Sequence, residues 1–185
     1  MEFKCKVSLI GNERVGKTSL ILRYINNTFS EEYMTTLGAD FVDKNYTRDD
    51  IGILKGNDSF NLVLWDMAGQ SHFKDVASIY CEGSAGIIIV FDISDKESFE
   101  ALPDWIQFAD KVAKDALRII VGNKTDLPMA ISEAEIKKME KRIKTPIRLV
   151  SAKMSLEEED SNVQDVFTTM ATDLVIKFQK QIEDA

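Results

Sequence analysis

The sequence predicts an α/β fold built around a mostly parallel β-sheet. Short apolar runs rich in β-branched residues alternate along the chain with helical patterns, which is typical of parallel strands joined by crossover helices. Apart from the alternating run at 62–65, these runs are almost continuously apolar, as expected for strands covered on both faces. We expect strands at residues 7–10, 62–65, 86–91, 118–121 and 147–150.

The remaining predicted elements are an edge strand and four helices. The segment from about Asp40 to Thr47 alternates more, which predicts a strand at the edge of the sheet. Helices are expected to begin near Lys17, Ser98, Ser132 and Asn162, and Ser132 followed by Glu135 has the pattern of a capping box. The last helix has the clearest apolar stripe, made by Val163, Val166, Phe167, Met170, Leu174 and Phe178.

Composition excludes several classes of protein. The chain has 185 residues and a formal net charge of −8, which argues against nucleic acid as a partner and against unaided binding to an anionic membrane surface. Cys5 and Cys81 are too few for a disulfide framework, so we expect reduced thiols. No signal peptide and no run of about 20 apolar residues is present, so a cytoplasmic protein is expected.

A phosphate-binding loop follows the first predicted strand. Residues 11–19, GNERVGKTS, fit the pattern G-x-x-x-x-G-K-[ST], in which glycines let successive backbone N–H groups point at phosphate oxygens. The lysine brings a positive charge to the β- and γ-phosphates, and the hydroxyl of Thr18 is a hard ligand for Mg²⁺. Phosphate contacts are therefore expected from Glu13, Arg14, Val15, Gly16, Lys17, Thr18 and Ser19.

A candidate hydrolysis site lies in residues 62–70, LVLWDMAGQ. Asp66 ends a predicted strand, at the edge of the sheet where ligands of α/β proteins bind, and a carboxylate there can hold Mg²⁺ through water. Gly69 offers an N–H group that can approach the γ-phosphate. The amide of Gln70 can accept from a water molecule while donating to phosphate, so Lys17, Gly69 and Gln70 are the candidate catalytic residues.

The base-reading residues identify the nucleotide as guanine. In residues 121–127, VGNKTDL, the carboxylate of Asp126 can accept from both the ring N–H and the exocyclic amine of guanine, a donor pair that adenine lacks. Asn123 can hydrogen-bond neighbouring loops and the base, and the stem of Lys124 can lie over the purine. After the next strand come Ser151, Ala152 and Lys153, where the Ala152 N–H can donate to the carbonyl oxygen of guanine.

These ordered motifs resemble those of the Ras superfamily of small GTPases over residues 3–178. The resemblance implies a P-loop NTPase fold with a six-stranded, mostly parallel sheet and about five helices, forming one G domain over residues 1–185. It also implies a GTP/GDP-binding switch that hydrolyses GTP slowly with Mg²⁺, held by Thr18, Thr36 and Asp66. In the first switch segment, Phe29, Tyr33 and Thr36 would pack the base, cover the phosphates and bind Mg²⁺.

The Rab branch fits best, because Phe41, Trp65 and Tyr80 match the aromatic residues with which Rab proteins read partners. The alternative is that these three are ordinary core aromatics. The resemblance further implies a monomer that meets an effector, an exchange factor and a GTPase-activating protein through residues 29–45 and 66–80. Peripheral membrane attachment is expected only if the native protein carries a lipidated tail.

Several features depart from the family pattern. The loop from Arg48 to Phe60 and the acidic loop after Lys153 are long, Glu13 and Arg14 replace small residues of the phosphate loop, and His72 replaces arginine. A GTP-binding interaction module with negligible hydrolysis is therefore an alternative, favoured by Glu13 and opposed by Gln70. No arginine is clearly placed to act in cis, so an activating partner is expected to supply one.

Overall fold

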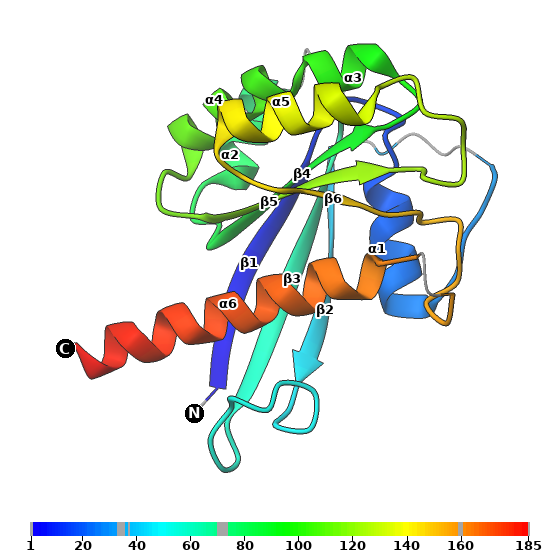
Figure 1. Ribbon diagram of the computed structural model, residues 1–185. Helices are drawn as coiled ribbons and strands as arrows, with labels where there is room; N and C mark the ends of the chain where they lie inside the picture. The colour runs from blue at the N-terminus through cyan, green and yellow to red at the C-terminus, as the bar shows by residue number, and fades with distance from the viewer. Residues whose placement is uncertain (1, 33–35, 37, 70–73, 159–160, 185) are drawn as a thin grey trace.

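The computed structural model describes residues 2–32, 36, 38–69, 74–158 and 161–184, with the side chains of residues 74–76 left out. Over this part of the chain, six strands form one sheet in the order β2-β3-β1-β4-β5-β6 (Figure 1). Only β2 and β3 run antiparallel, and the other neighbouring pairs are parallel. The expected fold class is therefore confirmed.

Strands β1, β3, β4 and β5 are longer than the apolar runs alone predict, because backbone pairing continues into flanking residues, whereas β6 ends one residue earlier than predicted. Their bounds are β1 (Glu2–Ile10), β2 (Ala39–Tyr46), β3 (Ser59–Met67), β4 (Gly86–Asp92), β5 (Leu117–Asn123) and β6 (Ile147–Leu149). The segment near residues 40–47 is an edge strand, as predicted.

Six helical segments cover the described part of the sheet, one more than expected. They are α1 (Lys17–Asn26), α2 (Lys74–Cys81), α3 (Lys96–Glu100), α4 (Leu102–Val112), α5 (Glu133–Ile143) and α6 (Val163–Glu183). The predicted helix near Ser98 is present as α3 and α4, which meet at Ala101. The capping box at Ser132 is also present, since its hydroxyl and the Glu135 side chain exchange hydrogen bonds with each other's backbone N–H groups.

Helix α2 was not predicted, because its sequence has no continuous apolar stripe. Only Ala77 and Cys81 are buried among its described side chains, whereas Ile79 and Tyr80 are exposed. The helix therefore packs through a narrow face of small residues, a pattern too short to be recognised by periodicity.

The sheet separates two hydrophobic cores. Side chains of α1 and α6 pack in one core, and side chains of α2 to α5 pack in the other. Strand β4 contributes to both, because Ile88 and Val90 point into the first core while Ile87 and Ile89 point into the second. This double burial explains why β4 is apolar at nearly every position.

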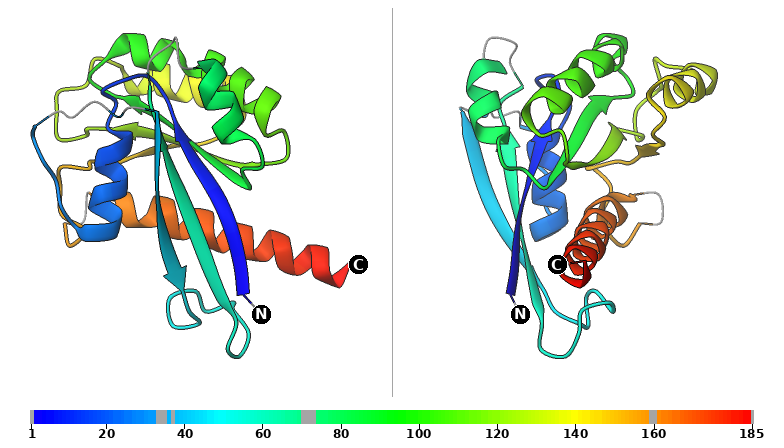
Figure 2. Two further views of the ribbon diagram at one scale, coloured as in Figure 1. Left: turned by 180° about the vertical axis from the view of Figure 1, so that it is seen from behind. Right: turned by 90° about the vertical axis from the view of Figure 1, so that its left-hand side faces the viewer.

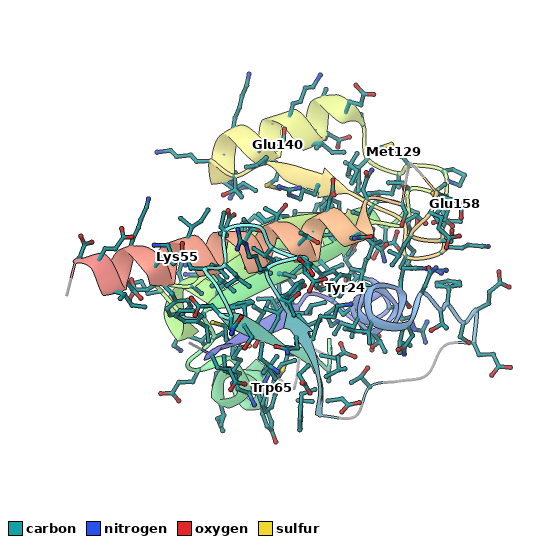
Figure 3. The ribbon with its side chains drawn as sticks, turned by 90° about the horizontal axis from the view of Figure 1, so that it is seen from below. Tyr24, Lys55, Trp65, Met129, Glu140 and Glu158 are labelled. Carbon is teal, nitrogen blue, oxygen red and sulfur yellow. The ribbon has the colours of Figure 1, made fainter. Side chains whose placement is uncertain are left out.

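The long loop between β2 and β3 is anchored to the body of the protein. Ile51 and Leu54 are buried in the core beneath α6. The Gln179 side chain of α6 donates to the backbone oxygen of Ile53 at 3.0 Å, and Lys55 lies beside the end of α6, 3.8 Å from Glu183 (Figure 3). Two buried side chains therefore anchor an otherwise mostly exposed loop to the core.

Replacing Leu54 with alanine should lower the free energy of unfolding by about 2–4 kcal/mol, because it leaves a cavity in that core. Leu54 is 2% exposed, whereas its neighbour Ile53 is 37% exposed, so Ile53→Ala is a matched control with a smaller expected cost. Urea unfolding at fixed GDP and Mg²⁺ measures both variants. Equal costs for the two substitutions would contradict the anchored loop.

Candidate functional site

The phosphate loop forms a tight turn between β1 and α1. Gly16 has a φ of 95°, and a Cβ there would lie 2.3 Å from the side-chain nitrogen of Asn123, so the position needs glycine. Lys17 is buried, and its ammonium group donates to the backbone oxygens of Gly11 at 3.0 Å and Asn12 at 2.8 Å. The Trp105 indole N–H donates to the Asn12 side chain at 2.7 Å, which fastens the loop to α4.

Burial lowers the pKa of Lys17 to about 8, against the opposing effect of the negative charges of Asp66 and Glu13. A phosphate group beside the ammonium would favour the charged form, so the pKa should be higher in the nucleotide complex. Because Lys17 would keep its proton to a higher pH in the complex than in the free protein, the affinity for GDP should be constant below about pH 8. It should fall as the pH rises through that value, by up to about tenfold per pH unit.

Equilibrium titrations of GDP between pH 7 and 10 test this expectation, with Lys17→Met as the control. Deprotonation of the guanine ring affects both proteins and cancels in their ratio. If the ratio of the wild-type affinity to the Lys17→Met affinity does not change with pH in this range, Lys17 does not take up a proton when the nucleotide binds.

The three predicted magnesium ligands meet at one point beside the loop. The Thr18 hydroxyl donates to Asp66 Oδ2 at 2.5 Å, the Thr36 hydroxyl lies 3.4 Å from the same oxygen, and the two hydroxyls are 3.0 Å apart. The other oxygen, Asp66 Oδ1, is buried and has no hydrogen-bond partner. A hard cation would satisfy this oxygen, so the donor set fits Mg²⁺. Burial raises the pKa of Asp66 in the protein alone, and a bound cation would favour its ionised form.

Gly69 lies directly against the phosphate loop. A Cβ built at Gly69 would be 2.4 Å from the carbonyl oxygen of Asn12 and 2.5 Å from the nitrogen of Glu13, so only glycine allows this approach. Gly69 therefore lies beside the phosphate loop, and the contact of its N–H with the γ-phosphate stays a prediction. The assignments of Tyr33, Gln70 and His72 fall outside the described residues.

The base-reading residues form a connected network. Asn123 donates to the backbone oxygen of Val15 at 2.9 Å and accepts from the Ala152 N–H at 3.1 Å, so it joins the phosphate loop to the loop after β6. The Ser151 hydroxyl donates to Asp126 Oδ1 at 2.6 Å and orients that carboxylate. The ammonium of Lys124 pairs with buried Asp92 at 2.5 Å, which fixes the end of the stem predicted to cover the purine.

One cleft of about 1020 Å³ collects nearly all of the predicted residues. Its described lining includes Glu13, Arg14, Gly16, Lys17, Thr18, Ser19, Phe29, Thr36, Asp66, Gly69, Asn123, Lys124, Asp126, Ala152 and Lys153. Val15 and Ser151 do not line it, because both side chains are buried behind it. They contribute to the site through Asn123 and Asp126, and direct nucleotide contacts from them stay a prediction.

The cleft also contains residues that sequence reasoning missed. Leu22 and Leu127 add apolar surface near the base-reading residues, and Glu31 closes one side through an ion pair with Lys153 at 3.0 Å. Leu127 directly follows Asp126, so its place in the cleft could have been predicted from the sequence. The pairing of Glu31 with Lys153 could not, because it joins segments far apart in the sequence.

An exposed aromatic cluster lies beside the cleft. Phe41 stacks on Trp65 with ring centroids 5.4 Å apart, and Trp65 contacts Tyr80 at 5.9 Å. Phe41 is 63% exposed, so it is not a core residue and the core-aromatic alternative does not hold for it. The three side chains predicted to read partners therefore do form one surface.

Comparisons with known proteins identify the family of this chain. The family model described as the Ras family matches residues 6–176. The chain is 36% identical to GTP-binding protein YPT1 of Saccharomyces cerevisiae, over 97% of this chain and 83% of that protein. It is 34% identical to Ras-related protein RabC of Dictyostelium discoideum (94% and 85% covered) and 37% identical to Ras-related protein Rab-1 of Theileria parva (92% and 74% covered).

The predicted phosphate loop, metal ligands and base-reading residues are thus found in a chain that matches this family along nearly its whole length. Nothing in the comparisons supports the alternative of a module without hydrolysis. The chain therefore belongs to the Ras family, and it is a Rab-like small GTPase, a switch that binds GTP and GDP with Mg²⁺ and hydrolyses GTP.

Proposed function

We propose that the cleft holds the guanine nucleotide through the residues predicted from the sequence, each in its predicted role. The observation that carries this proposal is the meeting of Thr18, Thr36 and Asp66 around an unsatisfied carboxylate oxygen. These three residues come from α1, the segment before β2, and β3. Their meeting point is next to Lys17, where a triphosphate would place its β- and γ-phosphates.

The proposed catalysis is positioning combined with electrostatic stabilisation. Backbone N–H groups of residues 13–18 and the ammonium of Lys17 stabilise charge on the transferring phosphoryl group. Mg²⁺ held by Thr18, Thr36 and Asp66 would neutralise phosphate charge. Gln70 orients water for attack on the γ-phosphorus, the bond to the bridging oxygen breaks, and GDP and phosphate leave. Arg14 is exposed at the cleft rim, and we expect an activating partner to supply the arginine that accelerates turnover.

The switch itself is proposed to be the segments 29–45 and 66–80. Thr36 in the first segment and Gly69 in the second both lie where they would contact the γ-phosphate or its metal, so loss of that phosphate would release both. Effectors, exchange factors and activating proteins would then read the state from the adjacent surface formed by Phe41, Trp65 and Tyr80. The Rab relatives favour a role in membrane traffic over other signalling.

Residues 1–185 are proposed to be a single monomeric G domain in the cytoplasm. Among the described residues, no helix is both long and apolar enough to cross a membrane. Peripheral attachment is proposed only for a native protein with a lipidated tail.

Single-turnover hydrolysis tests the function most directly. The protein is loaded with GTP or ATP, and phosphate release is followed with Mg²⁺ and with EDTA. We expect slow release from GTP that requires Mg²⁺, and no binding of ATP. Tight GTP binding with no turnover above the buffer rate would instead favour the interaction module without hydrolysis.

A further inference from the structure

Arg23 is a buried arginine that sits behind the nucleotide cleft without lining it. It is 6% exposed and lies in the second half of α1. Its guanidinium donates from Nε to the Ala152 oxygen at 2.9 Å and from Nη2 to the Lys153 oxygen at 2.8 Å. Nη1 donates to the backbone oxygen of Asn27 at 2.7 Å and to its side-chain oxygen at 2.9 Å.

All of these acceptors are amide oxygens. No carboxylate is found in an ion pair with Arg23 within the part of the chain that the structure describes. A buried guanidinium that donates to several amide oxygens holds them in a fixed arrangement, because its planar set of N–H groups cannot adapt to large shifts. The residues held most directly are Ala152 and Lys153.

The backbone around Ala152 is consequently held from two sides. Its N–H donates to the Asn123 side chain at 3.1 Å on the cleft side, and its C=O accepts from Arg23 on the other side. The same Asn27 side chain that accepts from Arg23 also accepts from the Leu156 N–H at 3.1 Å. Residues 152–156 are thus attached to the end of α1 at three backbone positions.

This attachment joins the phosphate site to the base site through one helix. Helix α1 starts at Lys17 and Thr18, and Arg23 follows about 9 Å further along its axis at the usual rise per residue. Figures 1 and 2 show the loop after β6 lying beside the C-terminal end of α1. The element that binds phosphate at its beginning therefore also supports the base-reading loop near its end.

We propose that Arg23 is a positioning residue for guanine recognition. It fixes the backbone of Ala152 at the edge of the base-reading site, so that the Ala152 N–H, which donates to Asn123 Oδ1 in the protein alone, can donate to the carbonyl oxygen of a bound base and prolong the residence of the nucleotide. The inference rests on the proposed assignment of the cleft to guanine nucleotide. Arg23 acts through Ala152 and Lys153, since it does not itself line the cleft.

Arg23→Lys is the test variant. It keeps the positive charge but replaces a planar fork of five donors by one ammonium, which cannot hold the oxygens of Ala152, Lys153 and Asn27 in the same geometry. Arg118→Lys is the matched control. Arg118 also donates to a backbone oxygen, that of Lys114, and pairs with Asp110, but it lies outside the cleft and the base-reading loop.

Two measurements are made on each full-length protein, with circular dichroism to show that it is folded. The first is the rate of GDP dissociation into excess unlabelled nucleotide. The second is the affinity ratio of GDP to 6-thio-GDP, which keeps both donors facing Asp126 and changes only the atom facing the Ala152 N–H. Sulfur is a weaker acceptor than oxygen, so we expect the wild type to prefer GDP by about fivefold.

For Arg23→Lys we expect GDP dissociation to be about tenfold faster and the preference for oxygen over sulfur to fall to within about twofold. Arg118→Lys should match the wild type in both. Unchanged dissociation, or faster dissociation with an unchanged oxygen-to-sulfur ratio, would overturn the proposal and leave Arg23 a structural residue. If Arg23→Lys does not fold, Asn27→Gly is measured instead. Glycine tolerates the φ of 51° at that position, and the substitution removes only the side-chain oxygen that accepts from Arg23 and Leu156. Faster GDP dissociation and a smaller preference for oxygen over sulfur are again expected.

A failure of the proposed function is distinguishable from a failure of this inference. If the wild type did not bind GDP in the first place, the assignment of the cleft would fall. If the wild type binds GDP and distinguishes oxygen from sulfur while Arg23→Lys behaves identically, only the role of Arg23 falls.

Discussion

Replacing Asp126 with asparagine should lower the affinity for GDP and GTP by about a hundredfold or more. The carboxylate is predicted to accept from two neighbouring donors of guanine, and an amide presents one acceptor and one donor group to that pair. Each base donor left without a partner in the cleft costs about 1–3 kcal/mol. Ser151 already orients the Asp126 carboxylate at 2.6 Å, so the loss should not be repaired by rotation of the side chain.

Nucleotide competition measures this effect. Xanthine nucleotides, which carry a carbonyl group where guanine has its amine, should gain relative affinity in Asp126→Asn. Asp115→Asn is the control, because Asp115 is exposed and does not line the cleft. Unchanged GTP binding in Asp126→Asn would remove this residue from the base-reading site.

Replacing Gln70 with leucine should leave GTP binding intact and slow hydrolysis by at least about tenfold, equivalent to roughly 1.4 kcal/mol of barrier. Leucine keeps the approximate size of the side chain but can neither accept from the attacking water nor donate to phosphate. The preceding residue, Gly69, lies against the backbone of Asn12 in the phosphate loop.

Single-turnover assays with Mg²⁺ separate binding from chemistry in this variant. Gln107→Leu makes the same chemical change at an exposed position on α4 and should turn over at the wild-type rate. A Gln70→Leu protein that hydrolyses GTP as fast as the wild type would show that another group orients the water.

The sequence by itself predicted the fold class and most of the described residues that line the cleft. Its motifs could be recognised because each is local: the chemistry needs particular residue types at fixed spacings in one turn. The order of apolar strands and helices then places these turns at one edge of a parallel sheet, where strands of the same direction end together. The meeting of Thr18 with Asp66 follows from that topology.

The tertiary structure decided which residues support those motifs. The contacts of Arg23 with Ala152, Trp105 with Asn12 and Gln179 with the 48–58 loop join segments far apart in the chain. The first and third of these contacts end on backbone oxygens, which place no demand on the identity of the residue that carries them, and Trp105 bonds an asparagine side chain 93 positions away. Such contacts leave no local pattern in the sequence. Helix α2 was missed for a different reason: the buried residues among its described side chains, Ala77 and Cys81, are one pair at i and i+4, too short a stripe to be recognised.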